Sequence, residues 1–181
     1  MIRCLPISGA LGTFVLATTL SAQTPRAAAL DALLERLVGQ WRMTGSVRGP
    51  PATYTLDATR VLQRRFVELH MEDVAQPPVY EARVFVGVDS AGSRYIAHWL
   101  DKFGAAFSIP PATGEARGDT IRLAFPYPDG AFRDTFVYER PTDTWYFRLE
   151  AADSAGGWQL FAEYHGSPPV EFGNPGLIAR N

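Results

Sequence analysis

The chain has 181 residues, which is enough for one domain and hardly enough for two. Its 17 basic and 19 acidic side chains nearly balance, and Arg64-Arg65 is the only adjacent basic pair, so the sequence excludes the basic footprint of a nucleic-acid-binding protein. The single cysteine, Cys4, lies in the N-terminal apolar segment, so the rest of the chain has neither a disulfide nor thiol chemistry.

Residues 1–22 have the pattern of an export signal. Arg3 is their only charge, residues 5–22 are almost uninterruptedly apolar, and Ser21-Ala22-Gln23 provides small residues for cleavage. The apolar run is marginal for a membrane span, which needs about 20 residues, and no basic cluster follows it. The sequence therefore predicts a periplasmic or secreted protein whose mature chain is not stably inserted in a membrane. An uncleaved anchor is the alternative.

A short amphipathic helix is predicted over residues 26–38. Leu30, Leu33, Leu34 and Leu37 recur at spacings of three and four, which places them on one helical face. Gly39 then ends the helical pattern.

From Trp41 onward the pattern is that of an all-β protein. Turn residues recur every 10 to 13 positions and separate runs rich in β-branched and aromatic residues. No helical period interrupts these runs, so antiparallel neighbours are expected. The predicted strands are 41–48, 53–61, 65–72, 79–88, 93–100, 105–108, 119–126, 132–139, 144–151 and 158–165.

The second face of several strands mixes aromatic with charged residues. Examples are the alternating sets Phe66-Glu68-His70 and Tyr146-Arg148-Glu150. A single antiparallel β-barrel with a partly polar interior explains this mixture, and a β-sandwich with amphipathic outer faces is the alternative. We assign the barrel domain to residues 26–165 and expect a loose tail over residues 166–181, which are rich in proline and glycine.

The segment Gly39-Gln40-Trp41 after a short helix resembles the lipocalin and fatty-acid-binding-protein (calycin) barrels. Further stretches resemble a bacterial lipocalin-like domain family of unknown function, and the likeness covers about residues 33–165. These stretches are Val61-Leu62-Gln63-Arg64-Arg65-Phe66-Val67, Phe85-Val86-Gly87-Val88-Asp89 followed by Tyr95, and Trp99-Leu100-Asp101 followed by Gly104. The resemblance implies a structural plug of Gly39 and Trp41 beneath the helix, and a cavity, but no activity.

A barrel of this kind predicts a small, mostly apolar ligand in the interior, since binding pockets are mostly apolar with few polar groups. The sequence does not identify that ligand or the oligomeric state. The predicted ligand-binding residues are Phe66, Glu68, His70, Tyr95, His98, Trp99, Phe136, Tyr138, Tyr146 and Arg148.

Three alternatives stay open. A barrel enzyme, an isomerase or a hydrolase, could use His70 with Glu68, because residues two apart on a strand point the same way. A haem-binding barrel could use His165 as axial ligand, as more distant relatives in the resemblance imply. The third is a non-catalytic envelope or assembly module that uses its strands to pair with a partner.

No other chemistry is indicated by the sequence. The three histidines lack a metal-binding spacing, so no metal and no cofactor other than the haem alternative is expected. Nucleophile-elbow and phosphate-loop motifs are missing. Five carboxylates could act as acid and base inside a barrel, although an arginine partner is the simpler expectation for each: Glu68, Glu81, Asp101, Asp134 and Glu150.

Overall fold

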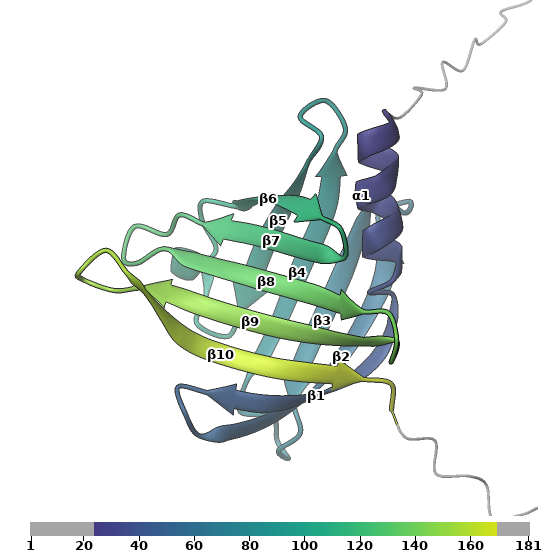
Figure 1. Ribbon diagram of the computed structural model, residues 1–181. Helices are drawn as coiled ribbons and strands as arrows, with labels where there is room; N and C mark the ends of the chain where they lie inside the picture. Colours follow the sequence, from purple (N-terminus) through teal and green to yellow (C-terminus); the bar gives the residue numbers. More distant parts are fainter. Residues whose placement is uncertain (1–23, 170–181) are drawn as a thin grey trace, which may run out of the picture.

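The computed structural model describes residues 24–169 as one α-helix, one 3₁₀ turn and ten strands (Figure 1). The predicted export signal, 1–22, and most of the predicted tail, 166–181, lie outside these residues. Within 24–169, the helix is too short to cross a membrane. The elements are α1 (Pro25–Glu35), β1 (Gly39–Val47), β2 (Pro51–Val61), β3 (Phe66–Asp73), β4 (Glu81–Asp89), β5 (Arg94–Asp101), η1 (Ala105–Phe107), β6 (Ala112–Arg117), β7 (Thr120–Phe125), β8 (Phe132–Glu139), β9 (Thr144–Ala152) and β10 (Trp158–Ser167).

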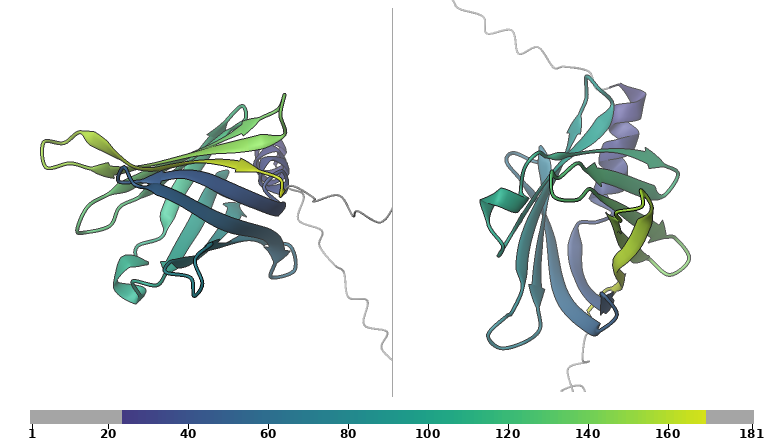
Figure 2. Two further views of the ribbon diagram at one scale, coloured as in Figure 1. Left: turned by 90° about the horizontal axis from the view of Figure 1, so that it is seen from below. Right: turned by 90° about the vertical axis from the view of Figure 1, so that its left-hand side faces the viewer.

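The ten strands close into a single antiparallel barrel. Each strand pairs with its neighbours in sequence, and β1 pairs with β10 from Arg42 opposite Ser167 to Val47 opposite Ala162. This closure confirms the predicted all-β barrel with a short N-terminal helix and rules out the sandwich. The right-hand view of Figure 2 faces the end of the barrel that lies away from α1, where the longer loops gather.

Helix α1 begins at a side-chain cap and ends earlier than predicted. The Thr24 hydroxyl accepts a hydrogen bond from the Ala27 amide, and Pro25 occupies the first helical turn, where its missing N–H costs nothing. After Glu35 the amides of residues 36–38 bond three residues back instead of four. These tight turns lead directly into β1, so the helix stops three residues short of residue 38.

Three side chains of the barrel fix the helix and the turn after it over one end. The Tyr95 hydroxyl donates to the carbonyl of Leu30 over 2.9 Å. The indole N–H of Trp145 donates to the carbonyl of Arg36 over 3.1 Å, and that of Trp41 to the carbonyl of Leu37 over 2.7 Å. All three rings are buried, so the helix and the turn after it are attached to this end of the barrel by hydrogen bonds that are shielded from water.

Arg60 of β2 connects helix α1 to the barrel. Its side chain is only 5% exposed and bonds the carboxylates of Asp31 and Glu35, each over 2.8 Å, and the carbonyl of Asp31 over 3.0 Å. The hydrogen bond from Arg60 is the main cause that lowers the pKa of the Glu35 carboxyl. The guanidinium therefore joins the two acidic positions on the polar side of α1.

We expect Arg60→Met to lower the free energy of unfolding by about 1–3 kcal/mol, because the hydrogen bonds from Arg60 to both carboxylates are lost. The loss is limited because water can still solvate the carboxylates of Asp31 and Glu35. Arg64→Met is the matched control, since Arg64 is exposed and reaches Glu35 only at 3.3 Å. Urea titrations of both variants measure the difference. Equal destabilisation of the two would contradict the role given to Arg60.

The sequence prediction is wrong between β5 and β7. Residues 105–108, predicted as a strand, form the 3₁₀ turn η1, which is entered at Gly104 with a φ of +91°. The strand at this point of the barrel is β6, which pairs with β5 over only three positions. Its Gly114 packs so close to β7 that a Cβ there would collide with the carbonyl oxygen of Arg122. The sequence of β6, Ala-Thr-Gly-Glu-Ala-Arg, has only one β-branched and no aromatic residue, the types by which a strand is usually recognised.

Candidate functional site

The interior of the barrel holds a small apolar cavity. Its volume is about 30 Å³, which is room for one or two water molecules. Any larger occupant would have to displace side chains. The lining residues come from eight strands: Met43, Leu56, Leu69, Met71, Val84, Trp99, Phe136, Phe147, Leu149 and Tyr164.

Four of the residues predicted to bind a ligand lie on the inner face of the barrel. Trp99 and Phe136 line the cavity itself. Tyr95 and Tyr138 are also buried, but they lie toward the helix-covered end, where Tyr95 bonds to α1 and Tyr138 packs on Trp145 with ring centroids 5.3 Å apart. Only the first two are therefore placed to touch an occupant of the cavity.

The other six lie on the outer face, so the prediction that they line the interior does not hold. In β3 the buried set is Val67, Leu69 and Met71, and successive side chains of a strand point to opposite faces. The mixed aromatic and charged face is thus the outer surface, where arginines pair with carboxylates. The six residues are Phe66, Glu68, His70, His98, Tyr146 and Arg148.

Asp134 is the one charged side chain buried on the inner face without a partner among the residues that the structure describes. It is 2% exposed, and its Oδ1 has no hydrogen-bond partner. On β8 it lies directly opposite Leu123 and Leu149. Burial raises the pKa of its carboxyl well above the usual range. A buried, strongly perturbed group of this kind marks a candidate functional position.

Glu150 and Glu68 have the arginine partners that the sequence suggested, whereas the half-buried Asp101 accepts from the Tyr80 hydroxyl over 3.2 Å instead. Glu150 accepts from Arg133 over 2.6 Å and from Arg148 over 3.2 Å. Glu68 accepts from Arg83 over 2.6 Å. Asp134 differs because it points inward, which its position between Phe132 and Phe136 on an apolar strand face could have indicated.

A chain of aromatic rings crosses the barrel end opposite the helix. We call this the mouth belt: Trp99, Phe125, Tyr127, Phe132 and Phe161. Successive ring centroids lie between 5.1 and 6.4 Å apart, the range in which aromatic side chains attract one another. The belt continues through the indole N–H of Trp99, which donates to the hydroxyl of Tyr80 over 3.3 Å. Trp99 connects the belt to the cavity, because it is a member of both.

Exposed apolar side chains lie outside the belt at the same end. Val79 precedes β4, while Phe103, Phe107 and Ile109 lie on the connection from β5 to β6, and each is 52–64% exposed. The ring of Phe103 packs against that of Tyr80, with centroids 6.2 Å apart. We call these four residues the apolar rim. Clustered exposed apolar side chains of this kind are typical of binding sites.

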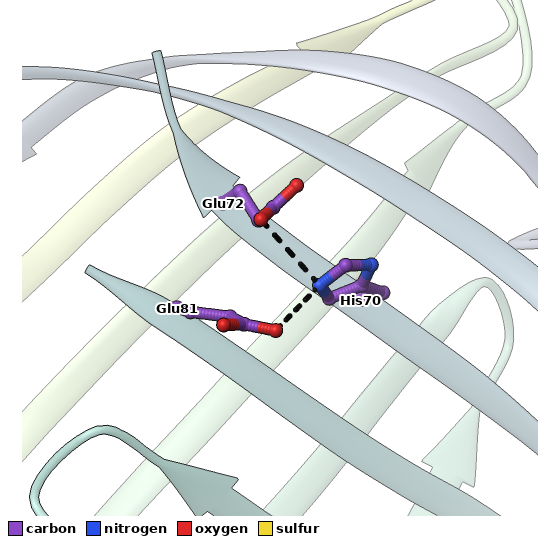
Figure 3. Close-up of side chains that lie close together, drawn as sticks. All are labelled: His70, Glu72 and Glu81. Atoms are coloured by element: carbon purple, nitrogen blue, oxygen red, sulfur yellow. Dashed lines mark hydrogen bonds and ion pairs between the residues drawn. The ribbon is translucent and has the colours of Figure 1, made fainter. Parts of the chain in front are cut away.

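The histidine and carboxylate proposed for an enzyme do not pair with each other. His70 Nε2 lies 2.9 Å from Glu81 Oε1 and 4.0 Å from Glu72 Oε1 (Figure 3), while Glu68 is bonded to Arg83. All of these groups are on the outer face of β3 and β4. The ligand atoms of His70, Glu72 and Glu81 lie within 4.8 Å of one another, close enough for one cation, but no second feature of residues 24–169 indicates a metal there.

The residues present do not fit a haem group held from inside the barrel. His165 is exposed on the outer face of β10, where its ring packs against Tyr146 with centroids 5.1 Å apart. The cavity lining contains neither histidine nor cysteine to bind an iron from within.

Comparison with solved structures supports the fold. The crystal structure of Rv2717c from M. tuberculosis matches with a TM-score of 0.53 and 15% sequence identity, and the match covers 81% of this chain and 99% of that chain. At this identity the likeness concerns the barrel fold alone. The sequence matches no protein-family model and no curated protein.

Proposed function

We propose that the protein is an exported, lipocalin-like barrel that binds a small, mostly apolar molecule in its interior. One observation carries the proposal: the apolar cavity shares Trp99 with an aromatic belt, and exposed apolar side chains lie at the same end of the barrel. Ligand pockets of proteins are mostly apolar and occur preferentially in the mouths of β-barrels. The His70–Glu68 enzyme is not put forward, because that pair is not formed.

Access to the cavity would be through the mouth. The opposite end is held by hydrogen bonds from three buried aromatic side chains to the backbone of residues 30–37. At the mouth, Tyr127 and the apolar rim lie on connections between strands, which rearrange more easily than strands do. A ligand larger than the 30 Å³ cavity would move the belt side chains outward as it enters. Trp99 would report this movement, since it belongs to both the belt and the cavity lining.

Native mass spectrometry of the purified mature protein, and titration with the neutral dye N-phenyl-1-naphthylamine, test the proposal. We expect a retained organic mass, or saturable dye fluorescence accompanied by a change in tryptophan emission. Val84→Phe should weaken dye binding at least tenfold, because Val84 lines the cavity and the added ring fills it.

Val137→Phe is the matched control. Val137 lies between the buried Phe136 and Tyr138 on β8 and therefore points outward, so the added ring should leave dye binding unchanged. Equal affinity of both variants and the wild type would place the dye outside the barrel. No saturable binding and no retained mass would remove the proposal.

A further inference from the structure

We propose that the interior ligand is an apolar amine, bound as its ammonium ion by the carboxylate of Asp134. This inference rests on the proposed function, because it needs an occupied interior. It adds the chemical class of the ligand and names the side chain that selects it.

The first reason is the state of Asp134 itself. Its side chain is 2% exposed and its Oδ1 has no hydrogen-bond partner among the described residues. Nearly all buried polar atoms of native proteins have a partner, so each exception calls for an explanation. An N–H donor delivered by a ligand supplies the missing bond. An ammonium group supplies charge as well, which makes the hydrogen bond stronger than a neutral donor would.

The second reason is that no cationic side chain of the described residues pairs with Asp134. No ion pair with Asp134 occurs among residues 24–169. Arg133, its neighbour in sequence, points to the outer face, where it bonds Glu150 and lies over the ring of Trp158 at 4.6 Å. Arg60, which reaches toward the interior from β2, is held at the helix end by Asp31 and Glu35. The negative charge of an ionised Asp134 is therefore uncompensated.

The third reason is the aromatic surroundings. Phe132 and Phe136 flank Asp134 on the inner face of β8, and Phe132 belongs to the mouth belt. Tyr127 and Tyr164 also lie near Asp134. Burial is the main cause of the raised pKa of both hydroxyls, and the negative charge of Asp134 raises the pKa of each further. Aromatic faces attract cations, and most strongly where water is excluded. The aromatic side chains around Asp134 thus favour an ammonium ion over a carboxylate at this position.

Three ligands of equal chain length test the inference: n-hexylamine, n-hexanol and hexanoate, each displacing N-phenyl-1-naphthylamine from the wild type. We expect hexylamine to displace the dye at least tenfold more effectively than hexanol, with hexanoate weakest. Asp134→Asn should remove the preference for the amine and leave hexanol unchanged. Asp57→Asn, an exposed carboxylate on β2, is the control that should keep the preference.

The outcomes separate the two proposals. Equal displacement by hexylamine and hexanol in the wild type would overturn the amine inference and leave the interior binding site standing. Retention of the amine preference in Asp134→Asn would also overturn it. Failure of the dye, and of all three ligands, to bind would remove the proposed function and the inference together.

Discussion

Replacing Trp145 with alanine is expected to lower the free energy of unfolding by about 3–5 kcal/mol, the usual cost of removing a large aromatic side chain from a core. The Trp145 side chain is fully buried and packs on Tyr138 and Phe147, with ring centroids 5.3 and 6.2 Å apart. The variant also loses the hydrogen bond from the indole to the carbonyl of Arg36. Both the barrel core and the attachment of the helix are therefore weakened. Urea denaturation followed by circular dichroism measures the loss.

Trp158→Ala provides the comparison for that result. Trp158 is 39% exposed at the start of β10, and the guanidinium of Arg133 lies over its ring at 4.6 Å. A partly exposed cation–π pair contributes about 0.5–1 kcal/mol, so this variant should lose no more than that. If the two tryptophan variants lost the same stability, Trp145 would not occupy the core position described above.

Replacing Asp134 with leucine is expected to raise the free energy of unfolding at pH 7 by about 1–3 kcal/mol, because a buried acceptor without a partner is removed. The new side chain would face Leu123 and Leu149, which are apolar and buried. The same variant should lose the preference for amines. Stability would thus increase at the expense of the proposed binding site, as is common for groups placed for function.

The increase in the free energy of unfolding caused by Asp134→Leu should depend on pH in a defined direction. Burial raises the pKa of the Asp134 carboxyl in the folded protein. At pH values between about 4 and this raised pKa, the folded state therefore keeps a proton on Asp134 that the unfolded state has released. The contribution of Asp134 to stability is fully present below about pH 4 and is lost as the pH rises through that window. The stability difference between Asp134→Leu and the wild type should therefore widen from pH 4 upward.

Denaturation of both proteins at several pH values between 4 and 9 measures this difference. Asp134→Asn is the companion variant, since it cannot titrate and should also remove the pH dependence. A difference that stayed constant with pH, or a Leu variant less stable than the wild type, would show that Asp134 is neither buried nor unpartnered in solution.

The sequence was sufficient to predict the helix, most strands and the closure of the barrel, but part of the argument for closure was mistaken. From the sequence, the mixed face of β3, with Glu68 and His70, suggests an inner face with a polar lining, but in the structure it is the outer face. Alternation identifies the residues that share a face and does not say which face is inside. The purely apolar set of Val67, Leu69 and Met71 was the better indicator, since buried faces carry few unpaired charges.

The ionic contacts could not be predicted, because they depend on the register between strands. His70 lies opposite Arg83 across β3 and β4, and Glu72 lies opposite Glu81. This register turns His70 toward Glu81 and leaves Glu68 to Arg83. A shift of one residue would exchange the faces, and the sequence alone does not fix it. The isolation of Asp134 likewise follows from which elements surround it, which sequence spacing does not describe.

The seam between β1 and β10 bears on how the protein is assembled. The barrel joins its first strand to its last, so the wall stays open until the whole chain is available. Until then β1 and β9 present unpaired backbone edges, which are templates for pairing with other chains. Contacts between such distant parts of a sequence also form slowly. The newly made polypeptide therefore passes through an aggregation-prone stage, and a chain truncated before β10 should be recovered mainly as insoluble material.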